Sequence, residues 1–413
     1  MRRLTFLHRK AVLVAACVVS AMALSAAQGQ APPPGQARGI TAPEFPVLPI
    51  GSPLPEFMLE GIDGKMHKSS EYTKTKGLAI MFESVHCPVS IAYEARAEEI
   101  HRTYRDKGLT FIAINPNNPK AVRLNELGYT DMTDSMPEMK VRAAFKGIDW
   151  PYLYDGETQG TSMKFGAVAT PHLFIFDQDH KLRYQGAIDD NQKPSLVKNH
   201  YAKDAIDALL SGTPVAVPES RAFGCSTKWL SKKTGVEEEW ASILAEPVTV
   251  DPINADGLKA LRANAGTGKT MVVSFWSTTC PRCASQFEDV QKTWWMFRRR
   301  PYLYTTVSVD APAKGAAVQA FLATQHAGNP NKQFASTDVA ALQAAFGAKW
   351  NPSQPFVMVI GPDGKLVYQK AGKWDIHEVR RYILSTFPDS QGYPGNQAYF
   401  QESVDRMAKA AKK

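Results

Sequence analysis

Residues 271–283 read Met-Val-Val-Ser-Phe-Trp-Ser-Thr-Thr-Cys-Pro-Arg-Cys, and this stretch decides which folds the chain can adopt. The apolar run Met271–Trp276 predicts a buried strand, and an apolar stripe with helical spacing begins directly after Cys283. That stripe consists of Phe287, Val290, Trp294 and Phe297. We therefore expect a strand, a turn that carries Cys-x-x-Cys and a helix in succession.

The position of Cys-x-x-Cys predicts redox chemistry. A thiol at a helix N-terminus faces free backbone N–H groups and the positive end of the helix dipole, which favour the nucleophilic thiolate. We expect Cys280 to attack a substrate sulfur, and the more buried Cys283 to resolve the mixed disulfide. Arg282 adds a positive charge that favours the thiolate. A zinc site would need further Cys or His ligands, which the neighbouring sequence does not supply. A static bridge is the other alternative.

The N-terminus reads as an export signal. Basic residues up to Lys10 precede an apolar run that ends in Ser25-Ala26-Ala27, a small-x-small cleavage pattern. We expect a signal peptide over residues 1–27 and a disordered spacer, rich in Pro, Gly, Gln and Ala, over residues 28–44. The mature chain is then periplasmic, with an uncleaved N-terminal membrane anchor as the alternative.

Length and charge limit the classes of function. A chain of 413 residues suggests two to three domains. The formal net charge of +8 falls to +4 when the four basic residues of the signal are removed, and so mild an excess does not indicate a nucleic acid partner. The basic run 298–300 ends a predicted helix, where cations suit the helix dipole. We expect no cofactor and no metal.

Removal of the signal leaves four cysteines, which are Cys87, Cys225, Cys280 and Cys283. An even count in an exported chain permits two disulfides with three connectivities. The nearest-neighbour pairing joins Cys280 to Cys283 and Cys87 to Cys225.

An earlier stretch repeats the pattern of strand, Cys-Pro and helix. The apolar run 78–82 predicts a strand, Cys87 and Pro88 follow, and a helical stripe comes next. When the two stretches are aligned on Cys87 and Cys280, Phe82 matches Phe275, and Ser90 stands where Cys283 stands. The first copy therefore lacks the local partner cysteine of the second.

The correspondence continues downstream of the cysteines. In both copies a late proline, Pro171 or Pro355, opens an apolar strand, and a Lys-Leu pair begins ten residues later. We interpret this as a duplicated fold. Alternating strands and helices that end in a hairpin predict an α/β fold with a mixed sheet flanked by helices. The expected domains span residues 45–230 and 231–388, and the tail, 389–413, is expected to be peripheral.

These motifs together resemble the thioredoxin superfamily, twice over nearly all of the mature chain. The second copy is similar to the exported thiol-disulfide oxidoreductases of the TlpA and ResA type. The first copy is similar to redoxin domains of the alkyl hydroperoxide reductase and thiol-specific antioxidant group. The residues that carry this second likeness are Asn115-Pro116-Asn117, Thr170-Pro171-His172 and Phe223–Trp229. The resemblance implies that Pro171 and Pro355 follow cis peptide bonds and present backbone groups to a substrate beside the redox sulfur.

The first copy departs from the superfamily pattern at the position of Ser90. Cys87 alone can form a mixed disulfide or a sulfenic acid but cannot close a local bridge, so Cys225 is its candidate resolving thiol. Ser84 fits the peroxidatic signature of peroxiredoxins, whereas Ile80 replaces its proline. His86 is a candidate for lowering the pKa of Cys87. A static Cys87–Cys225 bridge is the alternative.

Three functions follow from these patterns. The first is an exported thiol-disulfide oxidoreductase that acts on protein or small-molecule disulfides through Cys280 and Cys283, with an unidentified electron donor as a further partner. The second is a thiol peroxidase at Cys87 with Cys225 as the resolving thiol. The third is a non-enzymatic envelope scaffold whose disulfides are structural, since a fold does not fix a function.

Overall fold

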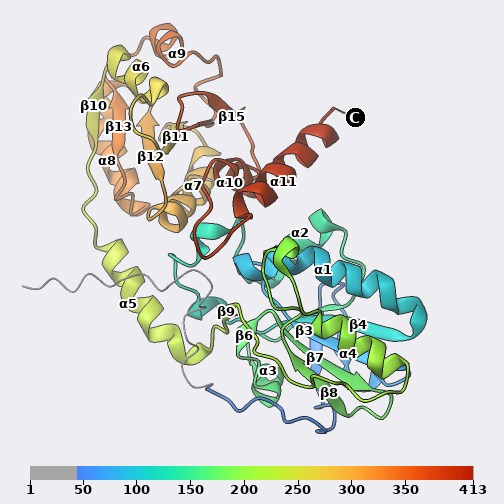
Figure 1. The fold of residues 1–413 in the computed structure, drawn as a ribbon. Coiled ribbons are helices and arrows are strands. Elements are labelled where there is room, and N and C mark those ends of the chain that lie inside the picture. The colour runs from blue at the N-terminus through green and yellow to red at the C-terminus, as the bar shows by residue number, and fades with distance from the viewer. Residues whose placement is uncertain (1–43, 413) are drawn as a thin grey trace, which may run out of the picture.

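The chain forms two lobes, each built around a mixed sheet (Figure 1). The computed structural model describes residues 44–412. The predicted signal peptide and all but the last residue of the predicted spacer lie outside the described residues. No helix within 44–412 is long and apolar enough to cross a membrane.

The first sheet has seven strands, and its centre is apolar on both faces. Its order across the sheet is β2 (Met66–Lys68), β1 (Met58–Gly61), β5 (Tyr152–Tyr154), β4 (Leu109–Asn115), β3 (Gly77–Phe82), β7 (His172–Asp177) and β8 (Leu182–Gly186). Every residue of β3 is buried. Met81 faces one hydrophobic cluster and Ile80 faces the other, because alternate residues of a strand point to opposite faces.

Helices cover both faces of this sheet. The helices are α1 (Pro88–Tyr104), α2 (Met136–Lys146), α3 (Gly160–Phe165) and α4 (Tyr201–Leu210). The stripe Tyr93, Ala97, Ile100 and Tyr104 of α1 and the apolar residues of α4 share one cluster with Met81. Phe165 of α3 packs on the other face with Ile80. A strand buried on both faces explains why β3 reads as a continuous apolar run.

The second sheet has six strands in an equivalent order. These are β10 (Asp251–Ile253), β13 (Asn331–Phe334), β12 (Tyr302–Ser308), β11 (Thr270–Trp276), β14 (Phe356–Ile360) and β15 (Leu366–Ala371). The surrounding helices are α6 (Ala255–Ala263), α7 (Cys283–Phe297), α8 (Gly315–Thr324), α9 (Val339–Phe346) and α10 (Ile376–Ser385). The apolar residues of α7 and α10 cover one face, and those of α6 and α9 cover the other.

Five consecutive strands, β5-β4-β3-β7-β8 and β13-β12-β11-β14-β15, have the same order in the two sheets, which confirms the predicted fold class and its duplication. β3 pairs with β4 and β7 as β11 pairs with β12 and β14. Phe82 lies opposite His172, and Phe275 lies opposite Phe356, so each residue after a late proline occupies the same register. The copies differ at the edge, where β1 runs antiparallel to β5 but β10 runs parallel to β13.

Shorter elements connect the sheets. A small ladder joins β6 (Ala169–Thr170) to β9 (Cys225–Ser226), and α5 (Lys233–Leu244) leads from the first lobe to the second. The 3-10 helices are Ser69–Tyr72, Arg105–Lys107, Pro119–Ala121, Leu127–Tyr129, Pro194–Leu196, Leu230–Lys232 and Pro312–Lys314.

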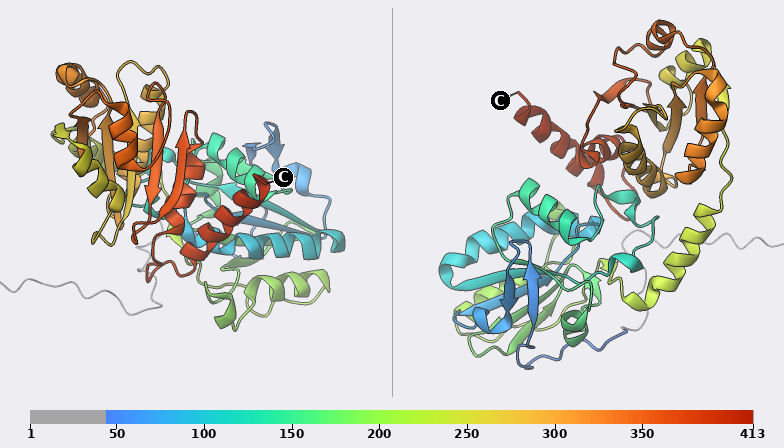
Figure 2. Two further views of the ribbon diagram at one scale, coloured as in Figure 1. Left: turned by 90° about the horizontal axis from the view of Figure 1, so that it is seen from above. Right: turned by 180° about the vertical axis from the view of Figure 1, so that it is seen from behind.

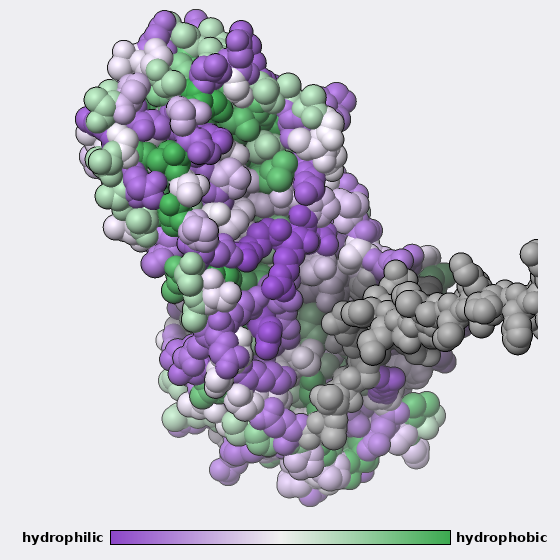
Figure 3. Space-filling view, turned by 90° about the vertical axis from the view of Figure 1, so that its left-hand side faces the viewer, coloured by the Kyte–Doolittle hydropathy of each residue, from purple (hydrophilic) through white to green (hydrophobic). Residues whose placement is uncertain are grey.

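The two lobes share an apolar cluster. Leu127 of the first lobe packs with Val290 and Met296 of α7 in a single hydrophobic cluster. Gly128 lies so close to α7 that a Cβ there would stand 3.1 Å from the carbonyl oxygen of Met296. Figure 3 shows hydrophilic residues on the surface of the waist between the lobes.

A buried carboxylate lies at the same interface. Asp131 is fully buried and accepts hydrogen bonds from Arg142 and Arg381, both at 2.7 Å. Arg142 belongs to the first lobe and Arg381 to α10 of the second. Burial alone would raise the pKa of Asp131, but the two guanidinium groups lower it below its ordinary value. Asp131 therefore remains charged and binds the lobes together.

The C-terminal tail is not peripheral, so the prediction for residues 389–413 is wrong. Helix α11 (Asn396–Ala410) lies against α10 and crosses to α1 of the first lobe (Figures 1 and 2). Phe400 is fully buried in the cluster that the two lobes share. Tyr399 donates a hydrogen bond to Glu94 of α1 at 2.9 Å. The weak amphipathic pattern of the tail concealed these anchoring aromatic residues.

Candidate active sites: two thiol pairs

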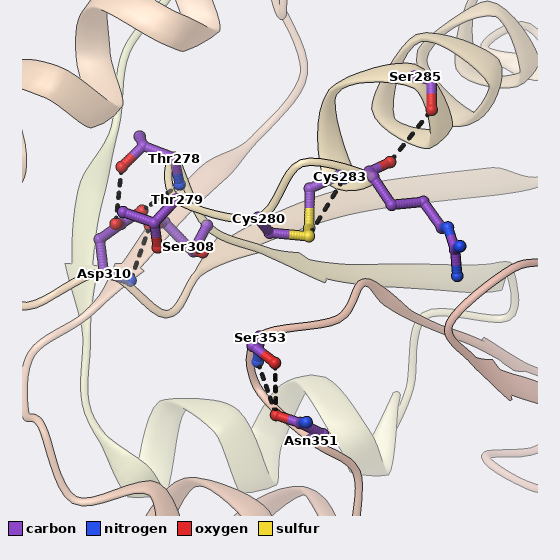
Figure 4. Close-up of a disulfide and its surroundings, with 11 residues drawn as sticks. Thr278, Thr279, Cys280, Cys283, Ser285, Ser308, Asp310, Asn351 and Ser353 are labelled. Carbon is purple, nitrogen blue, oxygen red and sulfur yellow. Dashed lines mark hydrogen bonds between the residues drawn. A yellow bond between two sulfur atoms is a disulfide. The ribbon is translucent and has the colours of Figure 1, made fainter.

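The second lobe carries a disulfide between Cys280 and Cys283 at the junction of β11 and α7 (Figure 4). The Cα atoms of the pair lie 5.3 Å apart. The helix begins at Cys283, so Cys280 lies in the preceding turn. The Sγ of Cys280 accepts a hydrogen bond from the Cys283 N–H at 3.1 Å. Cys280 is 6% exposed and Cys283 is 1% exposed, so Cys280 is the more accessible sulfur.

The turn before Cys280 is held by a buried carboxylate. Asp310, at the end of β12, accepts hydrogen bonds from the N–H and the hydroxyl of Thr278, both at 2.8 Å. The hydroxyl of Ser308 donates a third hydrogen bond to Asp310 at 2.9 Å. The turn that carries Cys280 is therefore fixed to the neighbouring strand, which holds the disulfide at the rim of the sheet.

The late proline of the second lobe does not have the expected geometry. Within residues 44–412, the cis peptide bond that the structure contains is Thr170–Pro171, so Pro355 follows a trans bond. The expectation of a cis Pro355 is wrong. Trans is the default for X-Pro bonds, and a local turn, in which the Gln354 N–H donates to the Asn351 carbonyl at 2.9 Å, orders this loop. The Asn351–Ser353 segment still faces the disulfide (Figure 4).

The first lobe places Cys87 directly before α1, as its N-cap residue. Its Sγ lies 3.4 Å from the Ser90 N–H and 3.1 Å from the Thr170 carbonyl oxygen. Cys225 pairs with Thr170 across the small ladder of β6 and β9, which brings it beside Cys87. Both cysteines are free thiols, and Cys87 is fully buried. Residues far apart in the sequence thus form a second thiol pair.

The two thiols of this pair have opposite pKa shifts. Burial raises the pKa of Cys87, but the hydrogen bond from Cys225, and then the charge of His86, lower it to a net value below the ordinary one. The pKa of Cys225 is raised, first by its hydrogen bond to Cys87 and then by burial. These opposite shifts favour the thiolate form at Cys87 and the protonated form at Cys225.

A buried carboxylate that the sequence reasoning missed organises the residues before Cys87. Asp134 is fully buried and pairs with the Nδ1 of His86. It also accepts hydrogen bonds from the Ser84 hydroxyl at 3.0 Å and from the Asn117 amide at 2.7 Å. In sequence, Asp134 stands among capping residues before α2, a pattern that signals only a helix start.

This network fixes the charge next to Cys87. Burial alone would lower the pKa of His86, but the charge of Asp134 and its hydrogen bond raise it above its ordinary value. The Ser84 hydroxyl also accepts a hydrogen bond from the Cys87 N–H at 3.1 Å. Asp134 therefore favours the protonated form of His86, whose positive charge lowers the pKa of Cys87. Within residues 44–412, no group of three or more His, Cys, Asp and Glu side chains is placed to hold a metal ion.

Comparison with known proteins agrees with this architecture. The AhpC/TSA family model matches residues 50–185, and the Redoxin model matches residues 247–382. The thiol-disulfide oxidoreductase ResA of Geobacillus thermodenitrificans is 22% identical over 140 residues, which are 34% of this chain and 70% of ResA.

Solved structures also match. A crystal structure of an uncharacterized conserved protein from Geobacillus kaustophilus is 34% identical, with a TM-score of 0.40, over 44% of this chain and 92% of that one. A thiol:disulfide interchange protein of the thioredoxin family from Chlorobium tepidum is 20% identical, with a TM-score of 0.29, over 39% of this chain and 97% of that one.

The paired sheets, the two strand–turn–helix cysteine sites and the two family matches define a thioredoxin-like redox protein. The chain is a tandem of two thioredoxin-like domains, of which the first matches the AhpC/TSA family model and the second matches the Redoxin family model.

Proposed function

We propose that this protein is an exported thiol-disulfide oxidoreductase that exchanges electrons with protein or small-molecule disulfides through Cys280 and Cys283. The observation that carries the proposal is the disulfide between these residues at the β11–α7 junction, with Cys280 as the more accessible sulfur. We assign residues 45–230 to the AhpC/TSA-type domain and residues 231–388 to the ResA-like domain. The N-terminal sequence pattern supports export to the periplasm.

The reaction follows from the order of the two sulfurs. In the reduced protein, the Cys280 thiolate attacks one sulfur of a substrate disulfide and releases the other as a thiolate. The Cys283 thiolate then attacks the Cys280 sulfur, closes the protein disulfide and releases the second substrate thiolate. Two electrons pass to the substrate, and its two thiolates take up protons. The reverse sequence oxidises a dithiol substrate. In either direction, the loop before Pro355 contributes to the surface on which the substrate docks.

Replacement of Cys283 by Ser tests this order. The Cys283→Ser variant retains the attacking thiol but cannot resolve the mixed disulfide, so it is expected to accumulate a covalent adduct with insulin chains. Mass spectrometry under non-reducing conditions identifies the adduct and its attachment site. The matched variant Cys280→Ser is expected to form none. Equal trapping by both variants, or by neither, would contradict the proposal.

A second candidate function, thiol peroxidase, is favoured by the first lobe. The Cys87 thiolate beside the protonated Cys225 is a nucleophile with its resolving thiol already in place. The thiolate attacks the O–O bond of a hydroperoxide, becomes a sulfenic acid, and releases an alkoxide or hydroxide that is protonated to the alcohol or to water. Cys225 then attacks the Cys87 sulfur, which forms a disulfide and releases water.

A dithiol must then return two electrons to the Cys87–Cys225 disulfide. The reduced pair Cys280 and Cys283 of the second lobe is our proposed source. The test is a Cys225→Ser variant, in which the sulfenic acid at Cys87 has no resolving thiol. It is expected to accumulate as a dimedone adduct after treatment with hydrogen peroxide. A Cys225→Ser protein that consumes no peroxide and yields no adduct would exclude this second function.

A further inference from the structure

A cavity of about 20 Å³ lies between α1, α2 and β5 in the first lobe. This volume is enough for one or two water-sized groups. Glu98 and Gly147, which are both exposed, line its rim. Glu83, Ser90 and Tyr152, which are all buried, line its inner wall. The lining therefore runs from the surface into the interior of the lobe.

The inner wall of this cavity carries buried polar atoms that have no hydrogen-bond partner within residues 44–412. Each belongs to a residue that is at most 7% exposed, and they are the Oγ of Ser90, the Nε of Arg142, the Nε1 of Trp150 and the hydroxyl oxygen of Tyr152. Buried polar side chains of native proteins are nearly always hydrogen-bonded. Four exceptions around one cavity indicate a binding site for a polar ligand.

The chemical class of the ligand follows from what these groups can donate. The Nε–H of Arg142 and the Nε1–H of Trp150 can only donate, and the hydroxyls of Ser90 and Tyr152 can donate as well. Burial raises the pKa of Glu83 to about 8, so at neutral pH this carboxyl is mostly protonated and is a further donor. A ligand that only accepts hydrogen bonds satisfies such a lining, whereas water brings two donors of its own.

The charges around the cavity are compatible with an anionic ligand. Arg142 binds Asp131 through one terminal nitrogen at 2.7 Å, which leaves its Nε–H for the cavity. At the rim, Lys146 pairs with Glu94 at 3.1 Å. The side chain of Glu98 is 48% exposed, so solvent screens its charge. An anion at the inner wall therefore lies next to a guanidinium group, while the nearby carboxylates are paired or screened.

The cavity also lies beside the turn that carries Cys87. Ser84 and Ser90 both line it. The Ser84 hydroxyl accepts a hydrogen bond from the Cys87 N–H at 3.1 Å, and the Ser90 N–H lies 3.4 Å from the Cys87 sulfur. A ligand in the cavity therefore contacts residues that themselves contact Cys87.

The second lobe replaces two of these polar groups. In the alignment on the two cysteines, Trp276 stands at the position of Glu83, and Cys283 stands at the position of Ser90. Trp276 and Cys283 pack together in one hydrophobic cluster. The polar lining is therefore a feature of the first copy.

We propose that the cavity between α1 and α2 binds the carboxylate group of a small organic acid. The two oxygens of a carboxylate offer about four lone-pair positions, which match the unpartnered donors of Ser90, Arg142, Trp150 and Tyr152. The site is distinct from both thiol pairs, so its existence does not depend on the functions proposed above.

Isothermal titration calorimetry of the full chain with sodium acetate tests this proposal. Acetate is expected to bind saturably, with one molecule per chain, and ethylammonium chloride, which carries an amine in place of the carboxylate, is expected not to bind. Glycine is a second probe, because tighter binding of glycine than of acetate identifies an amino acid as the ligand, and weaker binding identifies a simple acid. If acetate shows no saturable binding, the cavity holds water only and the proposal is overturned.

Substitutions that remove one donor each locate the bound acetate. Trp150→Phe and Tyr152→Phe keep most of the ring volume and are each expected to weaken acetate binding by about tenfold. Trp295→Phe is the matched control, because the Nε1 of this buried residue of α7 also has no partner within residues 44–412. It should leave the affinity unchanged. If Trp150→Phe fails to fold, Tyr152→Phe decides alone. Unchanged affinity in the folded cavity variants would overturn the proposal.

The pH dependence of acetate binding tests the part played by Glu83. The other titratable groups that line the cavity are Glu94 and Glu98 of α1, Arg142 and Lys146 of α2, and Tyr152 of β5. As the pH rises through about 8, Glu83 ionises and repels the carboxylate, so the affinity should fall by about tenfold or more. Glu83→Gln, whose amide still donates, should retain its affinity over the same range. An equal fall in both proteins would overturn the assignment of Glu83 to the site.

Discussion

The two thiol sites of this chain share one strand–turn–helix arrangement and differ in the residue that supplies the second thiol. In both, a cysteine follows a buried central strand and lies next to the first turn of a helix, with its Sγ near the N–H three residues on. In the second lobe that third residue is Cys283, and the pair closes locally. In the first lobe it is Ser90, and Cys225 arrives on a separate strand.

This difference shows that the shared fold fixes the position of the first thiol, whereas the surrounding segments determine which groups can reach it. Around Cys280, which is 6% exposed, the disulfide faces the loop before Pro355. Around Cys87, a strand, a buried His–Asp pair and a tail turn enclose the sulfur. The two copies thus share a fold but surround their cysteines with different segments.

The largest expected effect is that each of two cysteine variants loses one activity and keeps the other. Cys280→Ser is expected to lower insulin reduction by about 10³-fold or more, because it removes the attacking atom, while peroxide consumption driven by an external dithiol persists. Cys87→Ser is expected to do the reverse. Turbidity of reduced insulin and loss of hydrogen peroxide measure the two rates. If either variant lowered both activities equally, the two sites would not have separate functions.

The interface between the lobes gives the next largest effect. Asp131→Asn removes the buried carboxylate that accepts hydrogen bonds from both Arg142 and Arg381, and should lower the free energy of unfolding by about 3 kcal/mol. Asp256→Asn, which breaks an exposed pair with Lys259, should leave the free energy of unfolding almost unchanged. Urea denaturation of both variants measures the difference. Equal, small losses would show that the buried cluster does not hold the lobes together.

Ser90→Cys should allow the first site to form a local disulfide like that of the second site. The Ser90 N–H already lies 3.4 Å from the Cys87 sulfur, close to the 3.1 Å of the second lobe. Because a short loop costs less entropy to close than a long one, the new thiol should compete with Cys225 for Cys87 on oxidation. Disulfide mapping by mass spectrometry should then find Cys225 free in a large share of the chains. Ser90→Ala is the control, and continued pairing of Cys87 with Cys225 alone would count against the equivalence.

The smallest effect concerns pH. The Cys87 thiol has a lowered pKa, so its labelling by a small maleimide should reach a plateau at a pH below the ordinary thiol value of about 8.5. His86→Gln removes the buried cation and should raise that midpoint by about one pH unit. His101→Gln, on the far part of α1, should leave it unchanged. If the midpoint is unaltered in His86→Gln, the charge of His86 is not a cause of the lowered Cys87 pKa, and the hydrogen bonds alone account for it.

The lowered pKa of Cys87 also makes the stability of the folded protein depend on pH. A thiol whose pKa is lower in the folded than in the unfolded protein stabilises the fold above the unfolded pKa. That contribution is lost as the pH falls through the folded pKa of Cys87. The stability difference between the unaltered protein and Cys87→Ser should therefore shrink as the pH is lowered.

The repeated elements were predictable from sequence because they depend on local pattern. The apolar runs that end at Phe82 and Phe275, and the late prolines ten residues before a Lys-Leu pair, identify equivalent strands in both copies. The strand register then places the residues after Pro171 and Pro355 at the same positions. Periodicity of two and of 3.6 residues is enough to fix such elements.

The rest of the site depends on contacts between distant segments, which local pattern does not encode. Asp134 reads as a capping residue, and its role emerges only when His86 and Asn117 fold around it. Tyr393 stands in a tail whose amphipathic pattern is weak, yet it packs against the apolar cluster that contains Cys87. The trans bond before Pro355 likewise departs from what the family resemblance implied.

The most direct test of two redox-active thiol pairs is a titration of the full chain in thiol buffers of defined potential, with each cysteine followed by differential alkylation and mass spectrometry. Both pairs are expected to interconvert within about −270 to −180 mV, the range from thioredoxin to disulfide isomerase. If Cys280 and Cys283 stay oxidised below about −300 mV, and Cys87 and Cys225 do likewise, the disulfides are structural and the oxidoreductase account is contradicted.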